Sequence, residues 1–339
     1  MLLIYSTYNS PRLQYIADVL LYNLSGIPVS FTTRPYEFIE HDGPKINYSS
    51  GTLAQDEVKI IPASLLFETG ITAQNTYCKE RGGYKILFPA DNGDLPFDIF
   101  AASFYLLSRY EEYLPHRLDE YGRFAHTEST AYKEGFLQQP LINYWLVDFQ
   151  KLLQSKFTSL VFATKKFQFI PTYDIDIAFS YLHKGIARNS GGLVRSLLKG
   201  ELADMKERIA VLTKKKDDPF DVYEWLYALH LKYNLQPYYF FLVAAKPGNY
   251  DKNVDPQHAE MRELIRYHAV GYNTGIHPSW QSGDDNKLLE DEIQTLEDII
   301  GRKVVHSRQH YIRFTLPGTY RQLIDRGILN EFPMGYGPI

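Results

Sequence analysis

Asp174 and Asp176, which are separated by a single residue, have the spacing of a pair of catalytic or metal-binding carboxylates. They follow a short apolar stretch typical of a β-strand. Side chains alternate along a strand, so both carboxylates would point to the same side if the strand continues that far. One could then bind a metal ion while the other accepts a proton from water. The alternative is that both only cap a loop through backbone N–H groups.

Further polar side chains follow the later strand-like segments. His277 comes directly after one segment, Arg308 and His310 follow the next, and the last segment ends near Glu331. In parallel β/α folds the functional groups gather where the strands end. We therefore expect these groups to converge on one rim of the sheet, with Asp174, Asp176, His277 and Arg308 lining one cavity. The second aspartate and His277 should come within about 5 Å, close enough to share a metal ion.

Carboxylate and imidazole groups together favour a divalent transition metal, because Zn²⁺ binds both oxygen and nitrogen ligands. A catalytic zinc ion usually holds three protein ligands and one water molecule, whose pKa it lowers toward about 7. The sequence does not decide the third ligand of the metal ion, which could be Gln281, His310 or water. The sequence has no GxSxG, GxxxxGK[ST] or HExxH motif, which excludes the commonest alternative active sites.

A repeated strand and helix pattern in the second half of the chain would position these groups. Strand-like segments are expected at residues 167–173, 237–244, 270–276, 303–307 and 328–332, with helices between them. This rhythm predicts parallel β/α units in an open sheet or a barrel. A closed barrel of this kind needs roughly seven or eight strands, so we expect a barrel that is cut short at the C-terminus.

The first half of the chain has a separate alternation of strands and helices. Strands are expected at residues 2–5, 28–33 and 58–61, and helices at 10–24, 97–113 and 140–153. Ser10 is a favourable helix N-cap, Pro11 suits the first helical position, and Gly26 is a natural C-terminal stop. The pattern predicts an α/β domain at residues 1–160, followed by the second domain at residues 161–339.

The composition is that of a globular protein of about two domains, with 339 residues, 45% of them hydrophobic and 22% charged. A net charge of -4 argues against a general nucleic-acid binder. The single cysteine, Cys78, excludes an internal disulfide and CxxC zinc motifs. No apolar run reaches the length of a membrane span, and the start does not read as a signal peptide, so we expect a cytoplasmic protein.

At these motifs the sequence resembles the polysaccharide deacetylase superfamily, carbohydrate esterase family 4, and within it a Bacteroidetes branch with an extra N-terminal domain. The family's TFDDG-like motif reads TYDID at residues 172–176, and its HxxxH motif reads HPSWQ at residues 277–281. The arginine and proline motif corresponds to residues 308–317. The segment FDIFAASFYLLSRYEEY at residues 97–113 matches the branch, so the resemblance covers nearly the whole chain.

The resemblance implies a distorted seven-stranded β/α barrel that hydrolyses, with a bound metal, the N-acetyl groups of amino sugars in a polysaccharide or glycoconjugate. Asp174 would be the general base, oriented by Arg308 or Arg313. Asp176 and His277 would be metal ligands, with zinc as the expected metal. The residues assigned to binding of the carbohydrate substrate are Tyr173, Trp280 and His310.

The sequence departs from the family motifs at three places. Gln281 stands where the second histidine of HxxxH is expected, and Ile175 separates the two aspartates. The family's late histidine, the expected general acid, would lie beyond Ile339. Two other functions therefore stay open, a non-catalytic carbohydrate-binding protein on a degenerate deacetylase fold and a hydrolase of a small amide. A long groove would favour a polymeric substrate, and a closed pocket a small amide.

Overall fold

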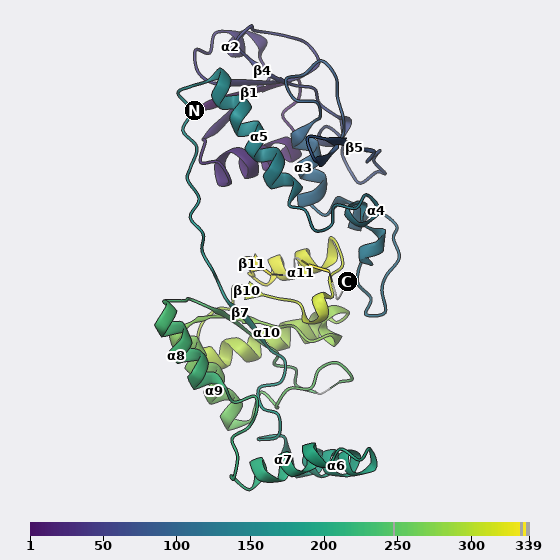
Figure 1. Ribbon diagram of the computed structural model, residues 1–339, viewed down its shortest axis with the longest axis vertical. Helices are drawn as coiled ribbons and strands as arrows, with labels where there is room; N and C mark the ends of the chain where they lie inside the picture. The colour runs from purple at the N-terminus through teal and green to yellow at the C-terminus, as the bar shows by residue number, and fades with distance from the viewer. Residues whose placement is uncertain (247, 333–334, 337–339) are drawn as a thin grey trace. The chain divides into compact units, whose positions relative to one another are not determined.

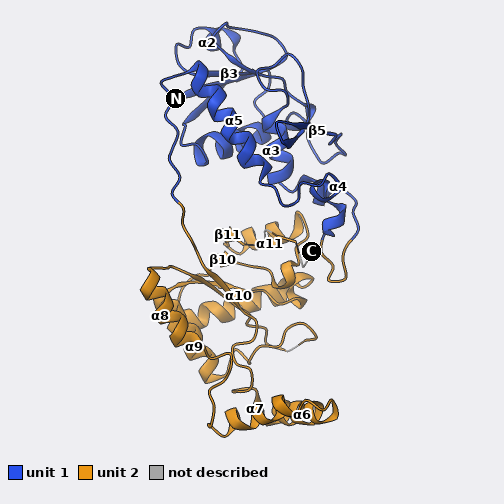
Figure 2. Cartoon of the chain, in the orientation of Figure 1, with its two compact units in different colours: residues 1–117, 124–166 blue, residues 118–123, 167–339 orange. Residues whose placement is uncertain are grey.

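The structure is a computed structural model that describes residues 1–246, 248–332 and 335–336 (Figure 1). The chain forms two compact units (Figure 2). The first contains residues 1–117 and 124–166, and the second contains residues 118–123 and 167–339. The short segment 118–123 thus belongs to the second unit although the chain on both sides of it belongs to the first.

A four-stranded parallel sheet with the order β2-β1-β3-β4 forms the centre of the first unit. Its strands are β1 (Leu2–Ser6), β2 (Val29–Thr32), β3 (Lys45–Tyr48) and β4 (Val58–Ile60). A separate antiparallel hairpin is formed by β5 (Cys78–Arg81) and β6 (Tyr84–Leu87). The strands at residues 2–5, 28–33 and 58–61 are confirmed, whereas β3 and the hairpin lacked a clear apolar pattern and were missed.

The helices of the first unit include the three that the sequence predicts. They are α1 (Pro11–Ala17), α2 (Pro35–Ile39), α3 (Ile99–Leu107), α4 (Thr130–Lys133) and α5 (Leu141–Lys156). The hydroxyl of Ser10 accepts a hydrogen bond from the backbone of Leu13, as expected of an N-cap. The helix expected at residues 97–113 is shorter than predicted. Arg109 adopts a left-handed backbone with φ of 53°, which separates α3 from a 3-10 turn at Tyr110–Tyr113.

The buried carboxylate of Asp98 connects three parts of the first unit. Its oxygens accept hydrogen bonds from the Tyr48 hydroxyl at 2.6 Å and the Ala63 amide at 2.7 Å. They also cap α3 by accepting from the amides of Phe100 and Ala101, both at 3.0 Å. Burial raises the pKa of Asp98 to about 6, and these hydrogen bonds oppose that increase. The carboxylate therefore ties the end of β3, the loop after β4 and the start of α3 together.

A five-stranded parallel sheet with the order β11-β10-β9-β8-β7 forms the centre of the second unit. Its strands are β7 (Thr172–Ile175), β8 (Tyr238–Phe241), β9 (Asn273–Ile276), β10 (His306–Ser307) and β11 (Asn330–Glu331). A strand overlaps each of the five predicted segments, and the strands lie side by side in chain order. The first begins later than predicted: residues 167–171 are not in a strand, and Phe167 and Phe169 are exposed. Within the described residues the sheet is open, with β7 and β11 at its edges, so the fold is α/β with parallel sheets and no closed barrel is seen.

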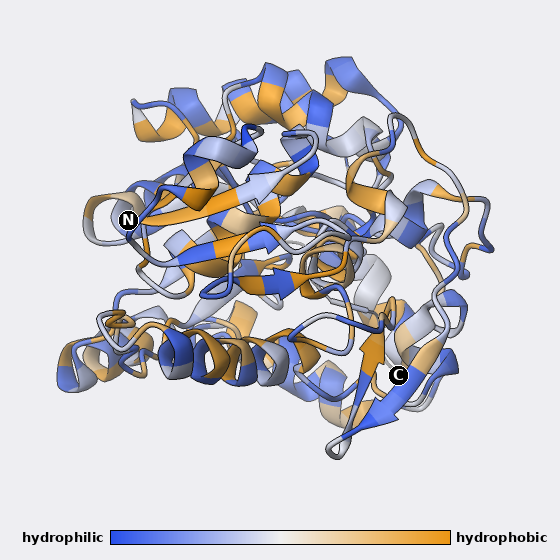
Figure 3. Cartoon of the chain, turned by 90° about the horizontal axis from the view of Figure 1, so that it is seen from above, coloured by the Kyte–Doolittle hydropathy of each residue, from blue (hydrophilic) through white to orange (hydrophobic). Residues whose placement is uncertain are grey.

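Four helices connect the strands of this sheet, as the sequence predicts. They are α8 (Tyr223–Tyr233), α9 (Ala259–Gly271), α10 (Asn286–Ile300) and α11 (Gly318–Asp325). Ile265 of α9 and Leu296 of α10 are fully buried with Ile276 of β9 in one apolar core. Several helices of the chain show a hydrophobic and a hydrophilic side (Figure 3).

The long connection from β7 to α8 carries two further helices, α6 (Gly185–Leu198) and α7 (Leu202–Leu212), which pack on each other (Figure 1). Gly200 lies between them with φ of 73°, a conformation that glycine adopts readily. Across the described part of the chain, no helix has both the length and the apolar character needed to cross a bilayer.

We expect Asp98→Ala to lower the free energy of unfolding by about 3 kcal/mol. The change removes the cap of α3 and leaves the Tyr48 hydroxyl and the Ala63 amide without their partner. Urea unfolding of the full chain, followed by circular dichroism, measures the effect. The control is Asp42→Ala at an exposed position, which should change stability by no more than about 0.5 kcal/mol. Equal stability of the two variants would show that Asp98 does not have this connecting role.

Candidate metal centre

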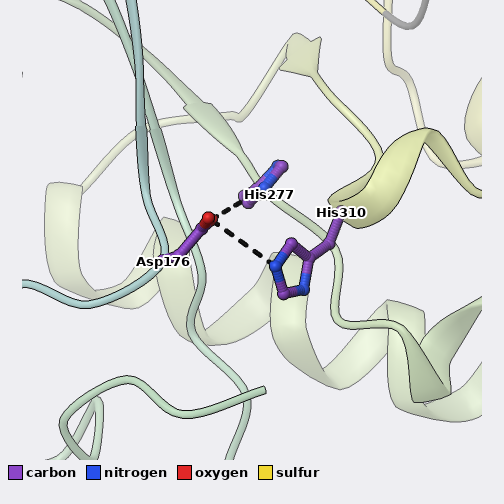
Figure 4. Close-up of side chains that lie close together, drawn as sticks. All are labelled: Asp176, His277 and His310. Atoms are coloured by element: carbon purple, nitrogen blue, oxygen red, sulfur yellow. Dashed lines mark ion pairs between the residues drawn. The ribbon is translucent and has the colours of Figure 1, made fainter. Parts of the chain in front are cut away.

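The carboxyl ends of three strands bring Asp176, His277 and His310 together (Figure 4). Asp176 directly follows β7, His277 directly follows β9, and His310 lies three residues after the end of β10. One ligand atom from each residue lies within 4.8 Å of the others. The expected proximity of Asp176 and His277 is confirmed, and the structure adds His310 to them.

The three ligand atoms face one another at short distances. Asp176 Oδ1 lies 3.0 Å from His277 Nε2 and 3.7 Å from His310 Nε2. Both histidines are buried, at 2% and 7% exposure. Asp176 Oδ1 is itself buried and has no hydrogen-bond partner in the described part of the chain. A buried carboxylate oxygen without a hydrogen bond is costly unless a cation is near.

Each histidine has its other ring nitrogen held by an acceptor. His277 Nδ1 donates to the backbone carbonyl of Arg308 at 2.5 Å, and His310 Nδ1 donates to Asp251 Oδ1 at 2.9 Å. With a proton fixed on Nδ1, the neutral ring directs the lone pair of Nε2 toward Asp176. Metal-binding histidines in proteins are oriented by such bonds. The donor set of two imidazoles and one carboxylate therefore fits a divalent transition metal.

Asp251 is the second acid at this centre, and it is only 1% exposed. In addition to the bond with His310, its oxygens accept from the amide of Trp280 at 2.9 Å and from Gln281 Nε2 at 3.3 Å. Burial alone would raise the pKa of Asp251, but the bonds to His310, Trp280 and Gln281 outweigh it and lower the pKa. Asp251 therefore remains ionised. Of the two side chains considered as third ligand, Gln281 contacts Asp251 and His310 is the third group of the triad.

Two members of the triad, Asp176 and His277, have pKa values shifted in opposite directions. Burial acts to raise the pKa of Asp176, but the interactions with His277 and His310 lower it below its ordinary value. Burial acts to lower the pKa of His277, but Asp176 and Asp174 raise it above its ordinary value. The carboxylate of Asp176 thus faces a positive charge, which either a proton on His277 Nε2 or a bound metal ion would provide.

Asp174 and Arg308 form an ion pair beside the triad. Asp174 Oδ1 accepts from Arg308 Nη1 at 3.1 Å, and the two side chains are 34% and 22% exposed. The Arg308 guanidinium lies over the rings of Phe240 and Phe332, at 4.9 Å and 5.9 Å from their centroids. The arginine is held in place by these rings, while the aspartate stays accessible to solvent.

Two predicted site residues lie elsewhere. Arg313 donates to the backbone carbonyl of Trp280 at 2.6 Å, pairs with Asp284 and lies 4.0 Å over the Trp280 ring, so it does not orient Asp174. Tyr173 stacks on Tyr239 and shares a hydrogen bond with His230 at 2.9 Å. Because side chains alternate along β7, Tyr173 points away from the side of Asp174 and packs against Tyr239 and His230.

Glu331, at the end of β11, is also close to this centre. Its carboxylate oxygens are buried and lack hydrogen-bond partners at standard geometry among the described residues. Burial raises the pKa of Glu331 to about 7, although the nearby Ser307 hydroxyl, the Gln309 amide and the charges of His277 and Arg308 act to lower it. Near neutral pH the side chain is therefore partly protonated, which limits the negative charge of the centre.

The segment 118–123 contacts the residue that follows His310, a contact that sequence reasoning missed. Arg123 Nη1 donates to the carbonyl of Tyr311 at 3.0 Å, and the ring of Tyr121 stacks on Tyr311 with a centroid distance of 5.1 Å. Tyr311 has a left-handed backbone with φ of 59°, which is unfavourable for a residue with a side chain. The two contacts hold that conformation and with it the position of His310.

The fold and the site define an α/β protein with a candidate metal centre at the carboxyl edge of a parallel sheet. In comparisons with known proteins, residues 2–158 match a family of unknown function, DUF7033. No curated protein matches the chain.

A solved structure described as a "putative polysaccharide deacetylase" from Mycobacterium smegmatis is also similar, with 16% sequence identity and a TM-score of 0.29. The match covers 48% of this chain and 49% of that one, so the chain spans about half the length of the structure it matches.

His310→Ala should weaken binding of Zn²⁺ or Co²⁺ by more than about 100-fold, because it removes one of three ligands. Zinc titration calorimetry and the visible absorption of the cobalt-loaded full chain measure this. His306→Gln is the matched control, since His306 lies at the start of β10, beside the first residues of β9. Unchanged cobalt spectra in the His310 variant would exclude it as a ligand.

Asp251→Ala should weaken zinc binding by about 10- to 100-fold, because His310 loses the acceptor that fixes its ring. The same calorimetric titration applies, with Asp255→Ala as a control at an exposed position of the same loop. If both variants bind zinc as tightly as the unmodified chain, Asp251 does not orient His310.

Proposed function

We propose that the chain is a metal-dependent hydrolase that removes acetyl groups from N-acetylated amino sugars of a polysaccharide or glycoconjugate. The observation that carries this proposal is the convergence of the triad Asp176, His277 and His310 with the Asp174–Arg308 pair at one sheet edge. A metal-binding triad beside a separate, solvent-accessible carboxylate is what metal-assisted hydrolysis of an amide requires.

The residues divide the work between binding and proton transfer. The triad would hold the metal, for which zinc is our choice from its preference for imidazole and carboxylate ligands. The bound ion would act as a Lewis acid toward the acetyl carbonyl and the attacking water. Asp174 would accept the proton of that water, since its carboxylate is partly exposed on the same side of β7 as Asp176. Arg308, which donates to Asp174 Oδ1 at 3.1 Å, would orient that carboxylate.

Aromatic side chains beside the triad favour a carbohydrate over a small amide. The Trp280 and Tyr250 rings lie 4.9 Å apart, Tyr250 and Tyr311 lie 5.2 Å apart, and Tyr311 is 4.6 Å from the ring of His310. Such rings offer an apolar face and, in tyrosine and tryptophan, a polar edge. This combination suits a sugar ring, which has an apolar C–H face and peripheral hydroxyls. Trp280 therefore keeps its proposed role in substrate binding.

Asp174→Asn should lower the rate of deacetylation by about 10²- to 10⁴-fold, because the amide cannot accept the proton from water. Acetate release from N-acetylglucosamine oligomers gives the rate, and metal analysis of the same samples gives the zinc content, which should not change. Asp284→Asn is a matched control, because Asp284 is another exposed aspartate paired with an arginine.

Four outcomes would count against this proposal. A fully active Asp174 variant would exclude the general base, and loss of zinc from it would make Asp174 a ligand. A chain that binds zinc but releases no acetate from any sugar would favour a small amide as substrate. A chain that does not bind zinc and does not release acetate, but still binds N-acetylglucosamine oligomers, would favour the non-catalytic alternative.

A further inference from the structure

Helix α6 exposes its large apolar side chains to solvent. Those with more than half of their surface exposed are Ile186 at 87%, Val194 at 57%, Leu197 at 60% and Leu198 at 83%. Soluble proteins expose scattered apolar residues, but a cluster on one helix marks an interaction surface. The neighbouring α7 adds further exposed apolar residues, namely Leu202, Ile209 and Leu212.

The orientation of α6 is the reverse of that of an ordinary surface helix, which buries its apolar face. Its buried residues are the polar Asn189 and Ser196, at 7% and 5% exposure. Asn189 Nδ2 donates to the carbonyl of Tyr181 at 3.0 Å, and its Oδ1 accepts from Arg208 Nη1 at 3.1 Å. The helix is therefore attached to the second unit by polar contacts, which leaves the apolar side chains outward.

Positive charges border this apolar face. Residues 184–200 include Lys184, Arg188, Arg195 and Lys199 and contain no aspartate or glutamate. Seen along a helix of 3.6 residues per turn, Arg188, Arg195 and Lys199 form one stripe beside the apolar residues. An exposed apolar stripe next to a basic stripe is typical of helices that lie in the surface of a membrane.

We propose that α6 docks the protein on a membrane surface that contains anionic lipids. Ile186, Leu197 and Leu198 would enter the boundary between headgroups and acyl chains. Arg195 and Lys199 would contact the lipid phosphates, whereas the guanidinium of Arg188 donates to the carbonyls of Lys252 and Asn253. The helix has 14 residues, too few to cross a bilayer of about 30 Å at 1.5 Å per residue. It therefore lies on the membrane and does not span it.

Charge also distinguishes this partner from a second copy of the chain. Two copies joined through α6 would bring the same basic residues together. The helix contains no acid, and the acid nearest to its C-terminal end, Glu201, already pairs with Lys199. A nucleic acid would satisfy the basic stripe but would leave the apolar side chains uncovered. An anionic lipid surface is complementary to both the basic stripe and the apolar side chains of α6.

The experiment is flotation of the full chain with vesicles of phosphatidylcholine, with and without phosphatidylglycerol. The chain should float with the anionic vesicles, and added salt should weaken the binding. The double substitution Leu197→Glu and Leu198→Glu should lower the affinity for anionic vesicles at least tenfold, because it removes two leucines that would be buried in the membrane. Leu231→Glu on α8 is the matched control at another exposed leucine, which is 64% exposed and should not change binding.

A second measurement applies if the charged variant fails to fold. Cys78 is the single cysteine and is buried, so Leu198→Cys provides one accessible thiol for an environment-sensitive fluorophore. Its emission should shift to the blue on anionic vesicles, whereas a label at Leu231→Cys should not shift.

Absence of flotation by the unmodified chain, or equal flotation of the leucine variant, would overturn the proposal. Self-association that the leucine substitutions abolish, without vesicle binding, would show that a second copy covers α6. None of these measurements depends on bound metal or on acetate release, so the outcome is independent of the proposed activity.

Discussion

The hydrogen bond between His310 Nδ1 and the carboxylate of Asp251 is the interaction on which the candidate site depends. A carboxylate that is 1% exposed is costly unless every oxygen is bonded, and Asp251 reaches this by joining three loops. It lies after β8, it accepts from Trp280 and Gln281 after β9, and it accepts from His310 after β10. The same bond fixes the tautomer that directs Nε2 toward Asp176. One buried charge thus both assembles the loops and prepares the metal ligand.

Much of the fold could be predicted from the sequence because its strands are apolar and its helices have clear starts and stops. Strand β8, which consists of Tyr238, Tyr239, Phe240 and Phe241, follows this rule. Strand β3 does not, because Lys45 and Asn47 are buried there by tertiary contacts. The Lys45 ammonium reaches the carbonyl of His41 and pairs with Asp56. The assignment of segment 118–123 to the second unit depends on contacts such as the one from Arg123 to Tyr311, between residues far apart in the chain.

The site was predictable where position in a strand decides the direction of a side chain. Asp174, Asp176 and His277 are such residues. Alternation along β7 could also have placed Tyr173 on the other side of the strand, because it is adjacent to Asp174. The choice between Gln281 and His310 as third ligand could not be made, since it depends on Asp251, an isolated acid in a loop. The choice between Arg308 and Arg313 as the partner of Asp174 could not be made either. It depends on the Phe240 and Phe332 rings beside Arg308 and on the Trp280 ring and carbonyl beside Arg313.

The helix proposed to dock on membranes is connected to the candidate metal centre. Arg188 of α6 donates to the carbonyls of Lys252 and Asn253, which directly follow Asp251. Asn253 in turn donates to the carbonyls of Ile175 and Leu242, at the ends of β7 and β8. The loop that orients His310 is therefore fixed to the sheet on one side and to α6 on the other. A displacement of α6 at a membrane must be accommodated in this loop, which is the structural route by which docking would reach the metal ligands.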